Sequence, residues 1–166
     1  GSLAGILSCK PYMAGRRTAT DKHLQEILDL RYVPEHAIFA AVDYAVSNLS
    51  LLGKDGYSLE SLNDGEKAKI MYAAHHLGEG DVKKFIENTM TSKRAEKLLI
   101  TQVGVKDAKK ELNDAGANWV KAHRAWLKRY IERKIKIGNF MCDPTQAPAT
   151  RDLLALADYL KNNKVK

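Results

Sequence analysis

The stretch from Ala74 to Ile86 reads AHHLGEGDVKKFI, and it decides the fold that we expect for this chain. Apolar residues spaced three and four apart lead up to Gly78, and glycine commonly ends helices. Asp81 is placed to cap a following helix, which contains Phe85. The stretch therefore predicts two helices joined by a Gly-Glu-Gly turn.

Two explanations of this stretch, a metal site and a phosphate-binding loop, fit it poorly. Neighbouring side chains of a helix point about 100° apart, so His75 and His76 do not easily share one ion. The residue four positions after His75 is Glu79, which lies beyond the glycine that ends the helix. No strand precedes Gly78, and no Lys-Ser or Lys-Thr pair follows Gly80, as a phosphate loop requires. We therefore expect neither a metal ion nor a cofactor.

The same residues match a motif of a known enzyme family. That motif reads Ala-Tyr-Asn-Ala-Gly, then any residue, then Gly, a short gap, Val and basic residues. The match runs from Ala74 to Ile86, with His75 and His76 in place of the Tyr and the Asn. The pattern resembles that of the lytic transglycosylases and goose-type lysozymes. Residues 33–56 resemble the Ala-rich helix that precedes the motif in those families.

This resemblance implies a lysozyme-like helical domain that acts on the glycan strand of peptidoglycan. It implies that one wall of a sugar cleft lies at the motif. The candidate substrate-binding residues are Tyr72, His75, His76, Gly78 and Gly80.

Cleavage of a glycosidic bond needs a carboxylic acid of raised pKa, which protonates the leaving oxygen. Glu79, in the motif turn, is the candidate catalytic acid within this chain. The Glu-Ser pair that carries the acid in the family is not matched before the helix that starts at Pro34. The family's spacing predicts that acid at about residue 1 or upstream of it.

Helical patterns also cover the rest of the chain, and strand patterns are nearly absent. The longest periodic run, residues 106–137, is rich in Lys and Arg, and Gly116 either bends this helix or divides it in two. We predict one all-α, lysozyme-like domain over residues 1–166, with about seven helices and a long basic helix in its C-terminal half. Further expected features are an N-cap at Thr20 or Asp21, a helix from Pro34 to Gly53 with the apolar stripe Ile38, Val42, Ala45, Leu49 and Leu52, a helix from Thr91 or Ser92 to Gly104, and a last helix capped by Thr150.

The positive charge of the chain is concentrated in one segment. The net charge is +7, and residues 81–140 contain 15 Lys and Arg against 7 Asp and Glu. A basic surface attracts polyanions such as nucleic acid, an anionic membrane or the bacterial cell wall, although a solvated helix face is the alternative. No apolar run approaches the roughly 18–20 residues that span a bilayer, so we expect no membrane insertion.

The two cysteines, Cys9 and Cys142, lack the paired spacing of a zinc site. They either form a disulfide, which would close a long loop, or remain two unpaired thiols.

The resulting prediction is a peptidoglycan-cleaving muramidase that is secreted or delivered to the bacterial periplasm, as antibacterial effectors are. Its expected partners are peptidoglycan glycan strands and an immunity protein or inhibitor, and not nucleic acid. Hydrolase and lytic transglycosylase chemistry both remain open. The alternatives are a catalytically inactive peptidoglycan-binding module and a basic helical nucleic-acid-binding protein, although no recognised nucleic-acid motif is present.

Overall fold

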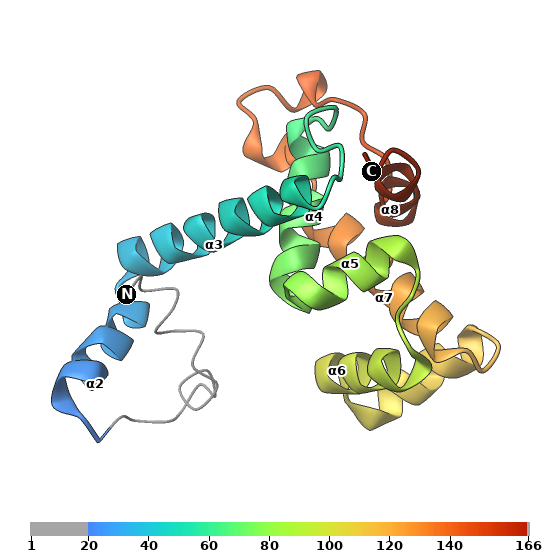
Figure 1. Cartoon of the computed structure of the whole chain (residues 1–166), viewed down its shortest axis with the longest axis horizontal. Helices are drawn as coiled ribbons and strands as arrows, with labels where there is room; N and C mark the ends of the chain where they lie inside the picture. The colour runs from blue at the N-terminus through green and yellow to red at the C-terminus, as the bar shows by residue number, and fades with distance from the viewer. Residues whose placement is uncertain (1–19, 166) are drawn as a thin grey trace. The chain divides into compact units, whose positions relative to one another are not determined.

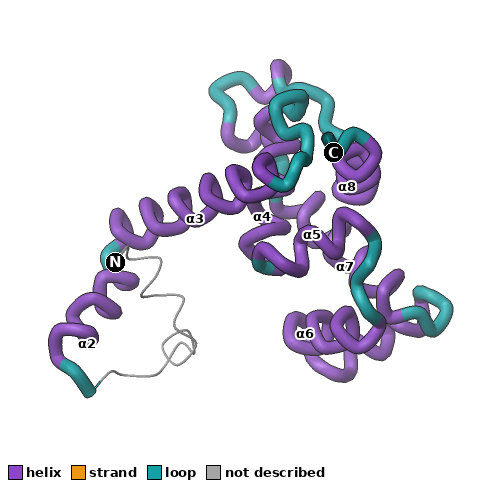
Figure 2. The backbone as a smooth tube through the Cα atoms, viewed as in Figure 1, coloured by secondary structure: helices purple, strands orange, loops and turns teal. Residues whose placement is uncertain are grey.

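A computed structural model describes residues 20–165, which form seven α-helices, labelled α2 to α8, and no strand (Figures 1 and 2). The all-α fold with about seven helices is therefore confirmed. The described residues divide into two compact units, with the boundary between residues 47 and 48. Within the described residues, no helix is both long and apolar enough to cross a membrane.

The first unit contains α2 (Lys22–Asp29), a short 3-10 helix (Leu30–Tyr32) and the larger part of α3 (Pro34–Lys54). The side chain of Asp21 accepts a hydrogen bond from the backbone N–H of Leu24 at 2.8 Å, so the predicted N-cap is confirmed. Helix α3 begins at Pro34 as predicted, but it continues past Gly53 to Lys54.

The apolar stripe predicted for α3 is only partly buried. Ile38 and Val42 are 62% and 49% exposed, which contradicts the expectation that they face a core. Leu52 is fully buried, and Leu49 packs against the same core. Among the stripe residues, only Leu52, in the part of α3 that belongs to the second unit, is fully buried within the described part of the chain.

The second unit contains the end of α3 and five further α-helices. These are α4 (Asp64–Leu77), α5 (Glu79–Glu87), α6 (Ser92–Asp114), α7 (Trp119–Lys134) and α8 (Leu153–Asn162). Two short 3-10 helices, Ile137–Phe140 and Pro144–Gln146, lie between α7 and α8. Helix α4 begins with a capping box, in which the Asn63 side chain accepts from the Glu66 N–H and the Glu66 carboxylate accepts from the Asn63 N–H.

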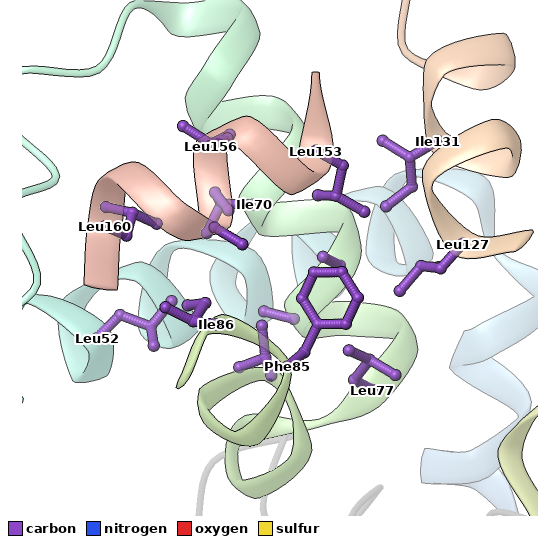
Figure 3. Close-up of a cluster of buried hydrophobic side chains, with 14 of the residues drawn as sticks. Leu52, Ile70, Leu77, Phe85, Ile86, Leu127, Ile131, Leu153, Leu156 and Leu160 are labelled. Atoms are coloured by element: carbon purple, nitrogen blue, oxygen red, sulfur yellow. The ribbon is translucent and has the colours of Figure 1, made fainter. Parts of the chain in front are cut away.

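The core of this unit is built by apolar side chains that point toward one another from α4, α5, α7 and α8 (Figure 3). Phe85 of α5 lies among them and is 1% exposed. Burial of each such side chain stabilises the fold by roughly 1.5–3 kcal/mol. The largest fully buried apolar members are Leu52, Ile70, Phe85, Ile86, Leu127, Ile131, Leu153, Leu156 and Leu160.

The long basic helix expected over residues 106–137 is divided in two. Helix α6 ends at Asp114, and α7 begins at Trp119. Between them Gly116 and Ala117 adopt positive φ angles of 65° and 60°, which an α-helix does not tolerate. Gly104, the predicted end of the preceding helix, has φ 80° and ψ 165° and kinks α6 at that point. The basic residues are therefore shared between a kinked α6 and a separate α7.

A buried ionic network joins α4, α7 and the segment before α8. Lys69 donates to Glu132 at 2.7 Å, to the Thr150 hydroxyl at 2.9 Å and to the Arg151 carbonyl at 2.9 Å. Thr150 is thus a partner of Lys69 and not the predicted helix cap. Asp152 caps α8 instead, and its carboxylate accepts from two backbone N–H groups.

The loop that follows α3 is hydrogen-bonded to the segment that follows α8. The N–H of Val165 donates to the carbonyl of Gly56 at 2.8 Å, and the Ser58 hydroxyl donates to the carbonyl of Asn163 at 2.6 Å. Gly56 has φ 88°, and a Cβ there would collide with the Val165 carbonyl oxygen. Only glycine permits this approach of the two backbones.

Cys142 is an exposed free thiol. Cys9 lies outside the described residues, and so does the disulfide that was considered for it.

Candidate functional site

The motif folds as two helices that meet at a single residue. The N–H of Gly78 closes α4 on the carbonyl of Ala74 at 2.8 Å, and the carbonyl of Gly78 accepts from Val82 in α5 at 3.0 Å. Gly78 has φ 77° and ψ 165°, a conformation that is open almost only to glycine. Helix α5 begins at Glu79, so Asp81 lies inside its first turn and is not the predicted N-cap.

His76 faces α7 and takes part in an aromatic cluster, by which we mean Tyr72, His76, Trp126 and Tyr130. The His76 ring centroid lies 5.6 Å from that of Trp126 and 6.3 Å from that of Tyr130. Tyr72 stacks on His76 at 6.5 Å, and Trp126 stacks on Tyr130 at 5.3 Å. All four residues are half-buried.

The helical spacing explains how this aromatic cluster forms. Tyr72 and His76 are four residues apart in α4, and Trp126 and Tyr130 are four residues apart in α7, so each pair lies on one face of its helix. The Tyr72 hydroxyl donates to the Tyr130 hydroxyl at 3.2 Å. Burial, with a contribution from this bond, raises the pKa of Tyr72 to about 12.

Two histidines of the site are held neutral. Burial, and then the neighbouring His75, lower the pKa of His76, whose Nε2 is buried with no hydrogen-bond partner among residues 20–165. His123 of α7 is fully buried behind the aromatic cluster, 6.5 Å from the rings of Phe85 and Trp126. Burial lowers the pKa of His123 to about 4, and neither of its nitrogens has a partner within the described part of the chain.

Asp81 fixes the start of α5 to α6. Its carboxylate accepts from Arg94 Nε at 2.7 Å and from Lys84 at 3.2 Å. Burial acts to raise the pKa of Asp81, but the hydrogen bonds from Arg94 and Lys84 outweigh it and hold this pKa below its ordinary value. Asp81 is therefore a structural anion, ionised at neutral pH.

Glu79, the candidate acid, lies on the surface. Its carboxylate contacts Lys83 at 2.9 Å, and its side chain is 48% exposed. Lys83 also contacts Asp55 at 2.6 Å, and these hydrogen bonds raise the pKa of Lys83. A general acid works best in apolar surroundings that keep its carboxyl protonated. Glu79 instead lies in a solvated setting beside a cation.

Of the six site residues predicted from sequence, the structure brings Tyr72 and His76 together. Gly78 forms the bend beside them. His75 is exposed on another side of α4, and Gly80 is exposed in the first turn of α5. Trp126 and Tyr130 of α7 were not among the site residues predicted from sequence. The sequence signal for this cluster is the repeated four-residue spacing of aromatic side chains in two helices.

Within residues 20–165 no group of three or more His, Cys, Asp or Glu side chains is placed to hold a metal ion. Comparison of the chain with family models, with curated proteins and with solved structures gives no match. A proposal for the function of this chain therefore rests on the geometry of the site and on the sequence motif.

Proposed function

We propose that this chain binds the glycan strands of bacterial peptidoglycan as a lysozyme-like domain of the muramidase class. The observation that carries the proposal is the half-buried aromatic cluster beside the Gly78 bend. Aromatic rings offer an apolar face on which a sugar ring stacks, while tyrosine hydroxyls, imidazole and indole N–H groups bind sugar hydroxyls. His76 and Tyr72 supply these groups from α4, and Trp126 and Tyr130 supply them from α7.

The charge of the second unit supports the same substrate. Peptidoglycan is an anionic polymer, and the 15 Lys and Arg residues between residues 81 and 140 raise its local concentration near the protein. The proposal places the chain where it meets the cell wall, after secretion or delivery to the periplasm. An enzyme of this kind requires an immunity protein or inhibitor in any cell whose wall it attacks.

The proposed role of the described residues is to bind the glycan. Cleavage additionally needs an acid, and Glu79 is ion-paired with Lys83 in a solvated setting. An inactive peptidoglycan-binding module is the second reading. It predicts the same aromatic cluster without turnover.

The test is incubation of the chain with purified, insoluble peptidoglycan. Co-sedimentation measures binding, and mass spectrometry identifies soluble products. Reducing-end muropeptides indicate a hydrolase and anhydro-muropeptides a lytic transglycosylase, whereas binding without products indicates the inactive module. If turnover is found, its loss in a Glu79→Gln variant identifies Glu79 as the acid. Absence of both binding and products refutes the proposal.

A further inference from the structure

Two cations lie at the α7 end of the aromatic cluster without a carboxylate partner in the described part of the chain. Arg133 Cζ lies 5.8 Å from the ring centroid of Tyr130, and Lys134 Nζ lies 6.0 Å from it. Both side chains are exposed. These distances are near the outer limit of a cation–π contact, so the ring holds both groups only weakly.

The neighbouring cations of α7 are already engaged. Lys128 contacts Asp152 at 2.9 Å, and Arg129 is paired with Glu111. The carboxylate next to Arg133 in sequence, Glu132, is turned inward and accepts from Lys69 and from the N–H of Leu153. The positive charge beside Tyr130 is therefore not compensated by Glu132, the single acidic residue of α7.

We infer that Arg133 and Lys134 form a carboxylate-binding subsite at the end of the aromatic cluster, which selects glycans with anionic substituents. The inference rests on the proposed function and names the substrate class of the same site. A guanidinium binds a carboxylate through two parallel N–H···O bonds, and an ammonium adds a second charge. When a sugar ring stacks on Tyr130, a carboxylate carried by that sugar lies near Arg133 and Lys134.

Peptidoglycan supplies that chemistry, because its muramic acid residues carry peptides with free carboxylates. A neutral polymer of N-acetylglucosamine offers the same ring faces and no anion. The subsite therefore distinguishes cell-wall glycan from chitin-like glycan. Single-stranded nucleic acid also combines stacking bases with anions, and it is tested as an alternative occupant.

The experiment measures binding of the whole chain by isothermal titration calorimetry. The probes are a muropeptide with free carboxylates, the same muropeptide with its carboxylates amidated, chitotetraose and an oligothymidylate. We expect the free muropeptide to bind at least tenfold more tightly than its amidated form. In the double variant Arg133→Gln, Lys134→Gln this ratio falls to about one, while the affinity for the amidated form is unchanged.

The matched control is the double variant Lys93→Gln, Lys97→Gln. It removes the same charge from exposed lysines of α6 that have no ion pair within residues 20–165, and it should keep the tenfold ratio. Equal binding of all three glycans by the wild-type chain overturns the inference and leaves the proposed function in place. Absence of glycan binding overturns both. If the α7 variant also binds the amidated form more weakly, Arg133 and Lys134 support the structure of the helix end and do not select carboxylates, which overturns the inference. Tighter binding of oligothymidylate than of any glycan assigns the surface to nucleic acid.

Discussion

Lys69 Nζ lies 2.7 Å from Glu132 Oε2, and this ion pair joins α4 to α7 with only 3% of the Lys69 side chain exposed. Two further oxygens, the Thr150 hydroxyl and the Arg151 carbonyl, complete the surroundings of the ammonium group. A buried ammonium group tolerates its loss of water when all its protons are bonded in this way.

Replacement of Lys69 with Met should lower the free energy of unfolding by about 3 kcal/mol, because Glu132 is left as an uncompensated, largely buried charge. Urea unfolding, followed by circular dichroism, measures the change. Lys128→Met is the matched control, since its pair with Asp152 is 37% and 40% exposed. It should cost less than about 1 kcal/mol. Equal losses in the two variants would show that the Lys69 network contributes nothing beyond a surface pair.

The stability of the fold should decrease with acid because of His123. This group is neutral in the fold, with a pKa of about 4, and titrates near 6.5 when unfolded. Between these values the unfolded chain binds more protons, so stability present above pH 6.5 is lost as the pH falls toward 4, by about 3 kcal/mol in total. Burial is the main cause; His76 and the cations Arg124 and Arg94 act in the same direction, and Asp81 opposes them.

The variant His123→Leu should remove most of this pH dependence and exceed the wild type in stability at pH 5. A smaller dependence should remain, since burial also lowers the pKa of His76. Melting temperatures measured from pH 8 to pH 4 test this. Phe85→Leu, a change at the ring that contacts His123 edge-on, is the control and should lower stability equally at each pH. An unchanged slope in His123→Leu would contradict the assignment.

Gly78 and Gly80 should respond to alanine in opposite directions. Neither position has an atom within 4 Å of an added Cβ, so the backbone alone decides the effect. At Gly78, with φ 77°, alanine should cost about 2 kcal/mol. At Gly80, which is helical, alanine should stabilise by about 0.5 kcal/mol. Chemical denaturation of both variants measures the difference, and a cost at Gly80 as large as that at Gly78 would refute it.

His76→Ala should weaken binding to peptidoglycan about tenfold, because it removes the ring that contacts Tyr72, Trp126 and Tyr130. The amount of protein that co-sediments with purified cell walls gives the affinity. His36→Ala, an exposed histidine of α3 in the first unit, should leave it unchanged. A wild-type affinity in the His76 variant would count against the aromatic cluster as the sugar-binding surface.

The helices could be predicted from sequence because local signals specify them. Pro34 starts a helix, Gly78 ends one, and apolar residues three and four apart mark the buried faces of α4 and α5. The errors arose where tertiary contacts decide the outcome. Thr150 resembled a cap but binds Lys69 from a distant helix. Val42 belongs to an apolar stripe of which only the second half, at Leu49 and Leu52, packs against the core.

The site was less accessible to sequence reasoning. The sequence named both His76 and Tyr72 as candidates, and the structure places their rings against each other on one face of α4. The contribution of α7 depends on the packing of two helices separated by more than forty residues, which no local pattern encodes. The cations beside Tyr130 were visible only as part of a basic segment. The sequence does not show which cations of α7 have acidic partners, because Lys128 and Arg129 pair with Asp152 and Glu111, which lie outside this helix.

The hydrogen bond from Val165 to Gly56 also concerns the connectivity of the second unit. The backbone that follows α3 touches the backbone that follows α8, so a short linker would bring these two segments into one continuous chain. The break at residues 115–118 is a natural place to open that chain, because no helix crosses it. A circular permutant that starts there and links the two segments keeps all five complete helices, and it provides a scaffold for fusing other domains beside α7.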